Sequence, residues 1–193
     1  MPLPAPAPRD LIHTRTIECK GYRRTDGLWD IEGHLVDMKD IDLDGDGARE
    51  MIPARTRIHN MWIRLTIDMA MNVLDVIAVT DDGPYPGCPA ITGNFRKLIG
   101  LTIGPGWQKA VRSRVGGTEG CTHLINLLGP VANTAFQTTV AARMVREKEI
   151  RERFLRDGVI EAKVDPYQLG SCHVYADGSP ESRARWPQLY KGR

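Results

Sequence analysis

The first half of the chain alternates apolar with mostly polar residues, and this period of two is typical of half-buried β-strands. The alternation is clearest from Met61 to Ile67, where every second side chain is apolar and Arg64 and Thr66 stand between. The segment Thr25–Gly27 is a turn signal between two such stretches, as in a β-hairpin. The predicted strands cover residues 11–22, 28–38, 54–68 and 73–80.

The second half changes to a period of three to four residues, which is typical of amphipathic helices. Gly104-Pro105 begins a predicted helix that ends at Gly116. The longest helix is predicted to begin at Thr118, with Pro130 kinking or dividing it. Because strands precede helices, the sequence predicts an α+β fold, in which an antiparallel sheet from the N-terminal half is packed by helices from the C-terminal half.

Length and composition fit one folded domain with tails. The chain has 193 residues, of which 41% are hydrophobic, so it can bury a sizeable core. We assign residues 1–10 to an extended Pro-rich arm, residues 11–156 to a single α+β domain, and residues 157–193 to an irregular C-terminal tail that packs on the domain.

Charge and cysteine content limit the possible binding partners and the cellular compartment. The net charge is only +2 and the two signs are interspersed, so we expect no nucleic acid partner. No apolar run reaches membrane-spanning length, and residues 1–8 lack the basic and apolar regions of a signal peptide. The four cysteines form no C-x-x-C pair. We therefore expect a cytoplasmic protein with reduced thiols and no membrane contact, for which a homo-oligomer is left open.

Three of the five histidines occupy positions that suit acid–base chemistry. His34 lies on the polar face of its predicted strand, where nearby Asp37 can orient its ring. His59 lies on an apolar face, so it is either a core residue with a satisfied partner or a pocket residue. His123 falls in the first turn of the long helix, whose dipole disfavours a protonated imidazole. We hypothesise that the three histidines line one pocket, with Arg24 and Asp37 at its edge.

Other candidate chemistry is weaker. No two histidines have a spacing that places both on one element, so a metal site would need the same three histidines brought together in space. Residues 40–45 copy the first half of an EF-hand calcium loop, but Met51 stands at the twelfth position, where the bidentate Glu belongs, which favours a solvated turn. Cys121 lies about 200° around the predicted helix from His123, which disfavours a nucleophile and base pair.

Several short blocks between residues 10 and 145 follow one another in a distinctive order. The blocks are Gly21–Asp30, Gly33-His34-Leu35 with Asp37 and Lys39, Ile58-His59 with Met61, Pro84-Tyr85 with Cys88, Gly106-Trp107, and Gly120–Leu124. In combination they resemble the bacterial domain-of-unknown-function family numbered 2889. The acidic residues 40–46 and the C-terminal tail match no pattern of that family.

The resemblance implies a role in the breakdown of aromatic compounds, including formaldehyde-releasing cleavage of lignin-derived aromatics. It leads us to expect a lyase without a cofactor that acts on a phenolic small molecule by histidine general acid–base catalysis. His34, oriented by Asp37, or His59 would be the base, and His123 a second acid or base. A metal-assisted hydrolase and a small-ligand binding protein are the alternatives. The groups expected to bind substrate and steady a developing oxyanion are Arg24, Lys39 and Tyr85.

Overall fold

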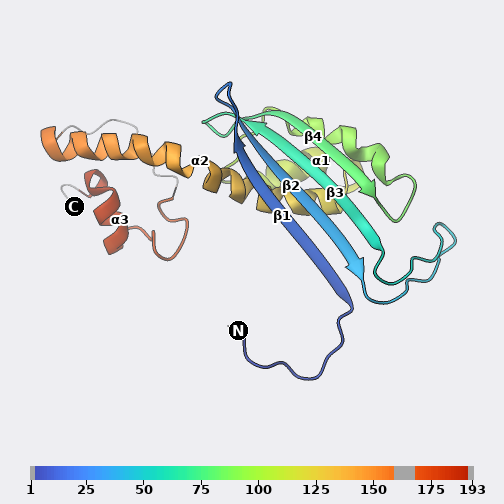
Figure 1. Ribbon diagram of the computed structural model, residues 1–193. Coiled ribbons are helices and arrows are strands. Elements are labelled where there is room, and N and C mark those ends of the chain that lie inside the picture. The colour runs from blue at the N-terminus through green and yellow to red at the C-terminus, as the bar shows by residue number, and fades with distance from the viewer. Residues whose placement is uncertain (1–2, 159–167, 191–193) are drawn as a thin grey trace. The chain divides into compact units, whose positions relative to one another are not determined.

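A four-stranded antiparallel sheet forms the N-terminal half, as the alternation predicted. The computed structural model describes residues 3–158 and 168–190. The strands are β1 (His13–Arg23), β2 (Trp29–Lys39), β3 (Arg57–Ile67) and β4 (Val73–Asp82). They lie side by side in the order β1-β2-β3-β4, and every neighbouring pair is antiparallel (Figure 1). Each strand therefore pairs with the next one along the chain, and β1 and β4 form the two edges.

The second half is helical, which confirms the predicted α+β fold. The 3-10 helix η1 (Cys88–Leu98) follows the sheet, and α1 (Trp107–Val115), the short η2 (Gly117–Glu119) and the long α2 (Thr122–Asp157) come next. The predicted start of the long helix at Thr118 is wrong, because Gly120 is extended and separates η2 from α2. Pro130 lies inside α2 and does not divide it.

One face of the sheet packs against helices to make the core. On β2 and β3 the side chains of Leu35 and Leu65 are fully buried, and Leu127 of α2 is buried with them. Helix α2 lies directly on β2, since a Cβ atom added to Gly33 would be 2.5 Å from Cγ2 of Val131. A glycine is therefore needed at this close approach of strand and helix. The helices α1 and the first part of α2 lie on this inner face (Figure 1).

The chain divides into two compact units, Met1–Thr138 and Thr139–Arg193. The second unit contains the C-terminal half of α2, helix α3 (Pro180–Arg185) and the short η3 (Pro187–Leu189). Its buried centre is Trp186, beside which Arg185 contacts both Glu147 and the hydroxyl of Tyr175. Residues 159–167 and 191–193, which belong to the predicted tail, lie outside the described residues. No helix in the described ranges is both long and apolar enough to cross a bilayer.

Candidate functional site

A buried carboxylate on β2 is the centre of the candidate site. The side chain of Asp37 is only 2% exposed, and it accepts hydrogen bonds from two arginine nitrogens and one histidine. Arg15 donates from Nε to Oδ1 and from Nη2 to Oδ2, both at 2.7 Å. Nδ1 of His59 lies 2.9 Å from Oδ2, and Nε2 of His13 lies 3.3 Å from Oδ1. Three of these four contacts are hydrogen bonds, so most of the acceptor positions of the carboxylate are used.

Strand register brings these groups together. Asp37 is directly opposite Arg15 on β1 and directly opposite His59 on β3. Side chains of directly opposite residues lie on the same face of a sheet, so the three form a row across three strands on the inner face. A register shift between Asp37 and Met38 falls at this row, and such irregularities commonly re-aim side chains near functional sites.

The hydrogen bond to Asp37 fixes the tautomer of His59. An ionised carboxylate can only accept, so Nδ1 of His59 must carry the proton that is shared with Oδ2. In the neutral ring, Nε2 then holds a lone pair and can accept a proton. The Asp37–His59 pair has the arrangement of a general base whose ring is oriented by an acidic partner.

His123 adds a second imidazole from the first turn of α2. Its ring centroid lies 3.7 Å from that of His59, with 32° between the ring planes. Sγ of Cys121 lies 3.9 Å from Nδ1 of His123 and also 3.9 Å from the sulfur of Met61. The expected separation of Cys121 from His123 around the helix is wrong, because Cys121 precedes the first residue of α2 and the helical angle does not apply.

Burial and charge keep both rings neutral and the carboxylate ionised. Burial lowers the pKa of His59 below its ordinary value, although Asp37 acts in the opposite direction. Burial also lowers the pKa of His123, with help from the charges of His59 and Arg15. Burial alone would raise the pKa of Asp37, but the hydrogen bonds and charge of Arg15, together with His59, outweigh it and hold that pKa low. At neutral pH the cluster therefore contains two neutral imidazoles beside one compensated ion pair.

The site is open to solvent on the side of edge strand β1. The side chains of His13 and Arg15 are 37% and 34% exposed, whereas that of His59 is 12% exposed. Arg15 uses Nε and one Nη2 hydrogen on Asp37, and a guanidinium has five donors in all. Exposed arginine donors therefore lie next to the deeper histidine base.

His34 is not part of this cluster. Residues 34 and 37 are three apart on one strand, so their side chains point to opposite faces of the sheet. On the outer face His34 stacks on Trp62, with ring centroids 3.5 Å apart and 5° between the planes. Its Nε2 is 2.7 Å from Oδ1 of Asn60. The expected His34–Asp37 partnership and the pocket of three histidines are therefore wrong in geometry, as is a three-His metal site.

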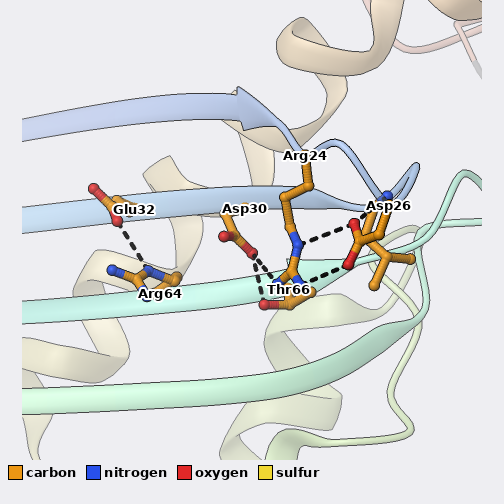
Figure 2. Close-up of polar contacts among 7 residues, drawn as sticks. Arg24, Asp26, Asp30, Glu32, Arg64 and Thr66 are labelled. Atoms are coloured by element: carbon orange, nitrogen blue, oxygen red, sulfur yellow. Dashed lines mark hydrogen bonds and ion pairs between the residues drawn. The ribbon is translucent and has the colours of Figure 1, made fainter.

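In the described part of the chain, none of the three residues expected to bind substrate makes a hydrogen bond or ion pair with the cluster. Arg24 sits at the turn between β1 and β2, where it pairs with Asp26 and Asp30 (Figure 2). Tyr85 donates its hydroxyl hydrogen to Asp46, 2.8 Å away. Lys39 ends β2 opposite His13, and within the described part of the chain its side chain makes no hydrogen bond or ion pair with Asp37. Arg24 is therefore not at the edge of the site as expected.

Sequence reasoning missed His13 and Arg15, although a signal for Arg15 was present. A hairpin centred on Asp26 pairs residues whose numbers sum to 52, and 15 and 37 form such a pair. The position of the turn at Thr25–Gly27 therefore already implied the strand register that sets Arg15 opposite Asp37. The sequence argument paired Asp37 with a neighbour on its own strand and did not test the facing strand.

The acidic loop that resembles half of an EF-hand is internally satisfied. Asp42 accepts the backbone N–H of Ala54, and Asp46 accepts those of Ala48 and Arg49 as well as the Tyr85 hydroxyl. A bridge between Leu43 and Ile52 closes the loop. These carboxylates act as turn-forming acceptors, in agreement with the solvated-turn interpretation.

The cluster also has side chains that could bind a metal ion. Asp37, His59 and His123 each offer a ligand atom, and these atoms lie within 4.8 Å of one another. Two imidazoles and a carboxylate suit several divalent metals. However, Asp37 already accepts three hydrogen bonds, from Arg15 and His59, and Nε2 of His13 lies 3.3 Å from Oδ1. A metal bound by Asp37 would have to displace a cation from it, so the residues present fit proton transfer better than metal ligation.

Comparison with known proteins places the chain in a family. A family model described as "Protein of unknown function (DUF2889)" matches residues 13–137. Neither the curated proteins nor the solved structures contained a match. The matched segment includes the whole cluster, from His13 on β1 to His123 on α2. Because it covers well over half of the 193 residues, the chain belongs to the DUF2889 family.

Proposed function

We propose that the Asp37–His59–His123 cluster is the acid–base centre of a lyase that works without a cofactor on a phenolic small molecule and releases formaldehyde from a hydroxymethyl group. The observation that carries the proposal is the hydrogen bond from Nδ1 of His59 to buried Asp37. This bond leaves Nε2 of His59 as the proton acceptor. The substrate class and the reaction type are what the family resemblance implies, and the cluster supports the acid–base part of the proposal.

The reaction needs one proton acceptor and one proton donor. His59 takes the hydroxyl proton of the substrate's CH2OH group, and the oxygen forms the C=O bond of formaldehyde as the carbon–carbon bond breaks. The electron pair of that bond stays on the substrate carbon and is delocalised over the aromatic system. The proton held by His59 then adds to this carbon, either directly or relayed through His123, and both rings return to their neutral state. The product has a hydrogen in place of the CH2OH group, so no oxidant or reductant is required.

Arg15 and His13 take the role expected of Arg24, Lys39 and Tyr85. They lie at the exposed side of the cluster, where a phenolic oxygen carries negative charge during the reaction. With both deeper rings neutral, the charges of Arg15 and Asp37 cancel. Once His59 has accepted a proton, the cluster carries one net positive charge beside the developing anion, which stabilises it.

The proposal is tested by incubating the purified protein with hydroxymethyl-bearing phenolic compounds and measuring formaldehyde. We expect His59→Gln to lower turnover roughly a hundredfold to ten-thousandfold, as for loss of a general base. His34→Gln is the matched control, because His34 lies on the opposite face and should leave turnover unchanged. Equal turnover in wild type and His59→Gln, or loss in His34→Gln alone, would contradict the proposal.

Two other functions predict different results. A metal-assisted hydrolase is favoured only by the 4.8 Å spacing of the three ligand atoms. Elemental analysis of untagged protein that finds a stoichiometric metal, lost in His59→Gln, would support that function and contradict ours. A binding protein without catalysis would retain the phenolic compound, measured by calorimetry, and release no formaldehyde.

A further inference from the structure

The two edge strands of the sheet differ in how well they are protected from pairing with another chain. At β4 the backbone of Val73 exchanges hydrogen bonds with Gly100 and Leu101, so the segment after η1 covers the start of that edge. The pairing of β4 with β3 also has two register shifts, near Asn60 and Thr66. Covering and irregularity are the usual ways in which proteins prevent an edge strand from pairing with another chain.

The other edge, β1, has neither protection. It is 11 residues long, contains no proline, and pairs with β2 without a register shift. Nine of its 11 residues are exposed. Among the described residues no strand pairs with its outer side. A long, regular, uncovered edge presents a row of backbone donors and acceptors that suits a further antiparallel strand.

We propose that β1 pairs antiparallel with β1 of a second copy of this chain, about a two-fold axis at Cys19, so that two sheets join into one of eight strands. This register sets Glu18 of each copy opposite Lys20 of the other. An axis at Glu18 would instead bring two glutamates together, and an axis at Lys20 would bring two lysines together. Opposite charges facing each other across strands stabilise a pair and like charges destabilise it, so these charges favour the axis at Cys19 over an axis at either neighbouring charged residue. Within one copy Glu18 and Lys20 already pair at 3.0 Å, and the second copy adds a partner for each.

Other side chains on β1 fit the same register. Ile17, which is 39% exposed, comes to lie opposite Gly21 of the second copy. Gly21 has no side chain because Thr138 occupies that space, and an added Cβ would be 1.8 Å from its Oγ1. The exposed isoleucine therefore gains an apolar neighbour in Thr138 of the second copy. Arg15 faces Arg23 of the second copy, and Asp37 already compensates the charge of Arg15.

Pairing at β1 also borders the candidate site, which opens along this strand. The second copy would continue the sheet beyond Arg15 and Ile17, both of which lie on the open side of the cluster. The inference does not depend on the proposed reaction, because it concerns mass and register only.

The test is the molar mass of the full chain by light scattering and sedimentation over micromolar to submillimolar concentrations. We expect wild type to be a dimer. Lys20→Glu places two pairs of glutamates face to face and should raise the dissociation constant about tenfold or more. The charge swap Glu18→Lys with Lys20→Glu should restore the dimer. Lys20→Glu also breaks the exposed ion pair between Lys20 and Glu18 of the same copy. Lys97→Glu is therefore the matched control, because it breaks an exposed ion pair with Glu119 away from β1.

Three results would overturn the inference: a monomeric wild type at all concentrations, a dimer indifferent to Lys20→Glu, or a charge swap that fails to rescue. The register has its own test. Directly opposite Cα atoms in an antiparallel pair are roughly 4.5–5.5 Å apart, within the span of a disulfide. In a chain with the exposed Cys172 changed to Ser, oxidation should link two copies through Cys19. A dimer that forms no such link, or links after Cys19→Ser, has a different axis.

Discussion

Arg15→Gln is the sharpest test of the charge balance in the cluster. The change removes two 2.7 Å hydrogen bonds from Asp37, whose side chain is 2% exposed. Breaking a buried ion pair typically costs about 3–5 kcal/mol, because it leaves an uncompensated charge. The Arg15 side chain is 34% exposed, so water replaces part of what is lost. We therefore expect the free energy of unfolding to fall by about 2–3 kcal/mol.

The same substitution has a second, directional effect on the histidines. The positive charge of Arg15 adds to burial in lowering the pKa values of His59 and His123. Removing this charge must raise the pKa values of both histidines, because a protonated ring is then no longer repelled by a neighbouring cation. Histidine ring proton signals followed by NMR against pH measure this without any substrate, and urea titration measures the stability.

Arg64→Gln is the matched control, because Arg64 pairs with Glu32 in an exposed contact on the outer face (Figure 2). An exposed pair contributes about 1 kcal/mol or less, and this one is remote from both rings. If Arg15→Gln costs no more than Arg64→Gln, Asp37 is not held by Arg15 as described. If the two histidine pKa values stay unchanged or fall, the electrostatic reasoning about the cluster is wrong.

Three further outcomes are expected. Gly33→Ala should lower the free energy of unfolding by about 1–3 kcal/mol, because its Cβ would be 2.5 Å from Val131, and adding Val131→Ala should recover part of it, measured by urea titration. The melting temperature should fall on acidification below about pH 6.5, because histidines with lowered folded pKa values take up protons more readily when unfolded, and His59→Gln with His123→Gln should flatten this dependence. Calcium should produce no heat in calorimetry and no change in melting, because Asp42 and Asp46 already accept hydrogen bonds from neighbouring residues.

Much of the fold could be read from local patterns. The strand patterns predicted all four strands to within a few residues, and the alternation is clearest where one face of the sheet is buried. Residues 73–80 were predicted from a continuous apolar run typical of a central strand, whereas β4 is an edge strand. The helical half was also predictable, but its boundaries were less so. The predicted helix start at Thr118 was wrong because a turn of 3-10 helix and an extended Gly120 precede α2. Local propensity does not distinguish such a turn from the first turn of a helix.

The candidate site was predicted only in part. His59 was placed inward by the alternation, and His123 in the first turn of the long helix, and the structure puts both rings in contact. His34 was wrongly included in the predicted site because it is close to Asp37 in sequence. Proximity along a strand does not bring side chains together, because positions three apart face opposite ways.

The sequence by itself determined the class of the fold, the order of its strands and helices, and the inward direction of His59, because each depends on periodicity within one segment. Only the tertiary structure decided which groups surround Asp37. Those contacts join β1, β2, β3 and the start of α2, and they depend on strand register and on how closely α2 approaches Gly33. Register and packing distance are relations between segments far apart in the chain, so no local pattern carries them in full.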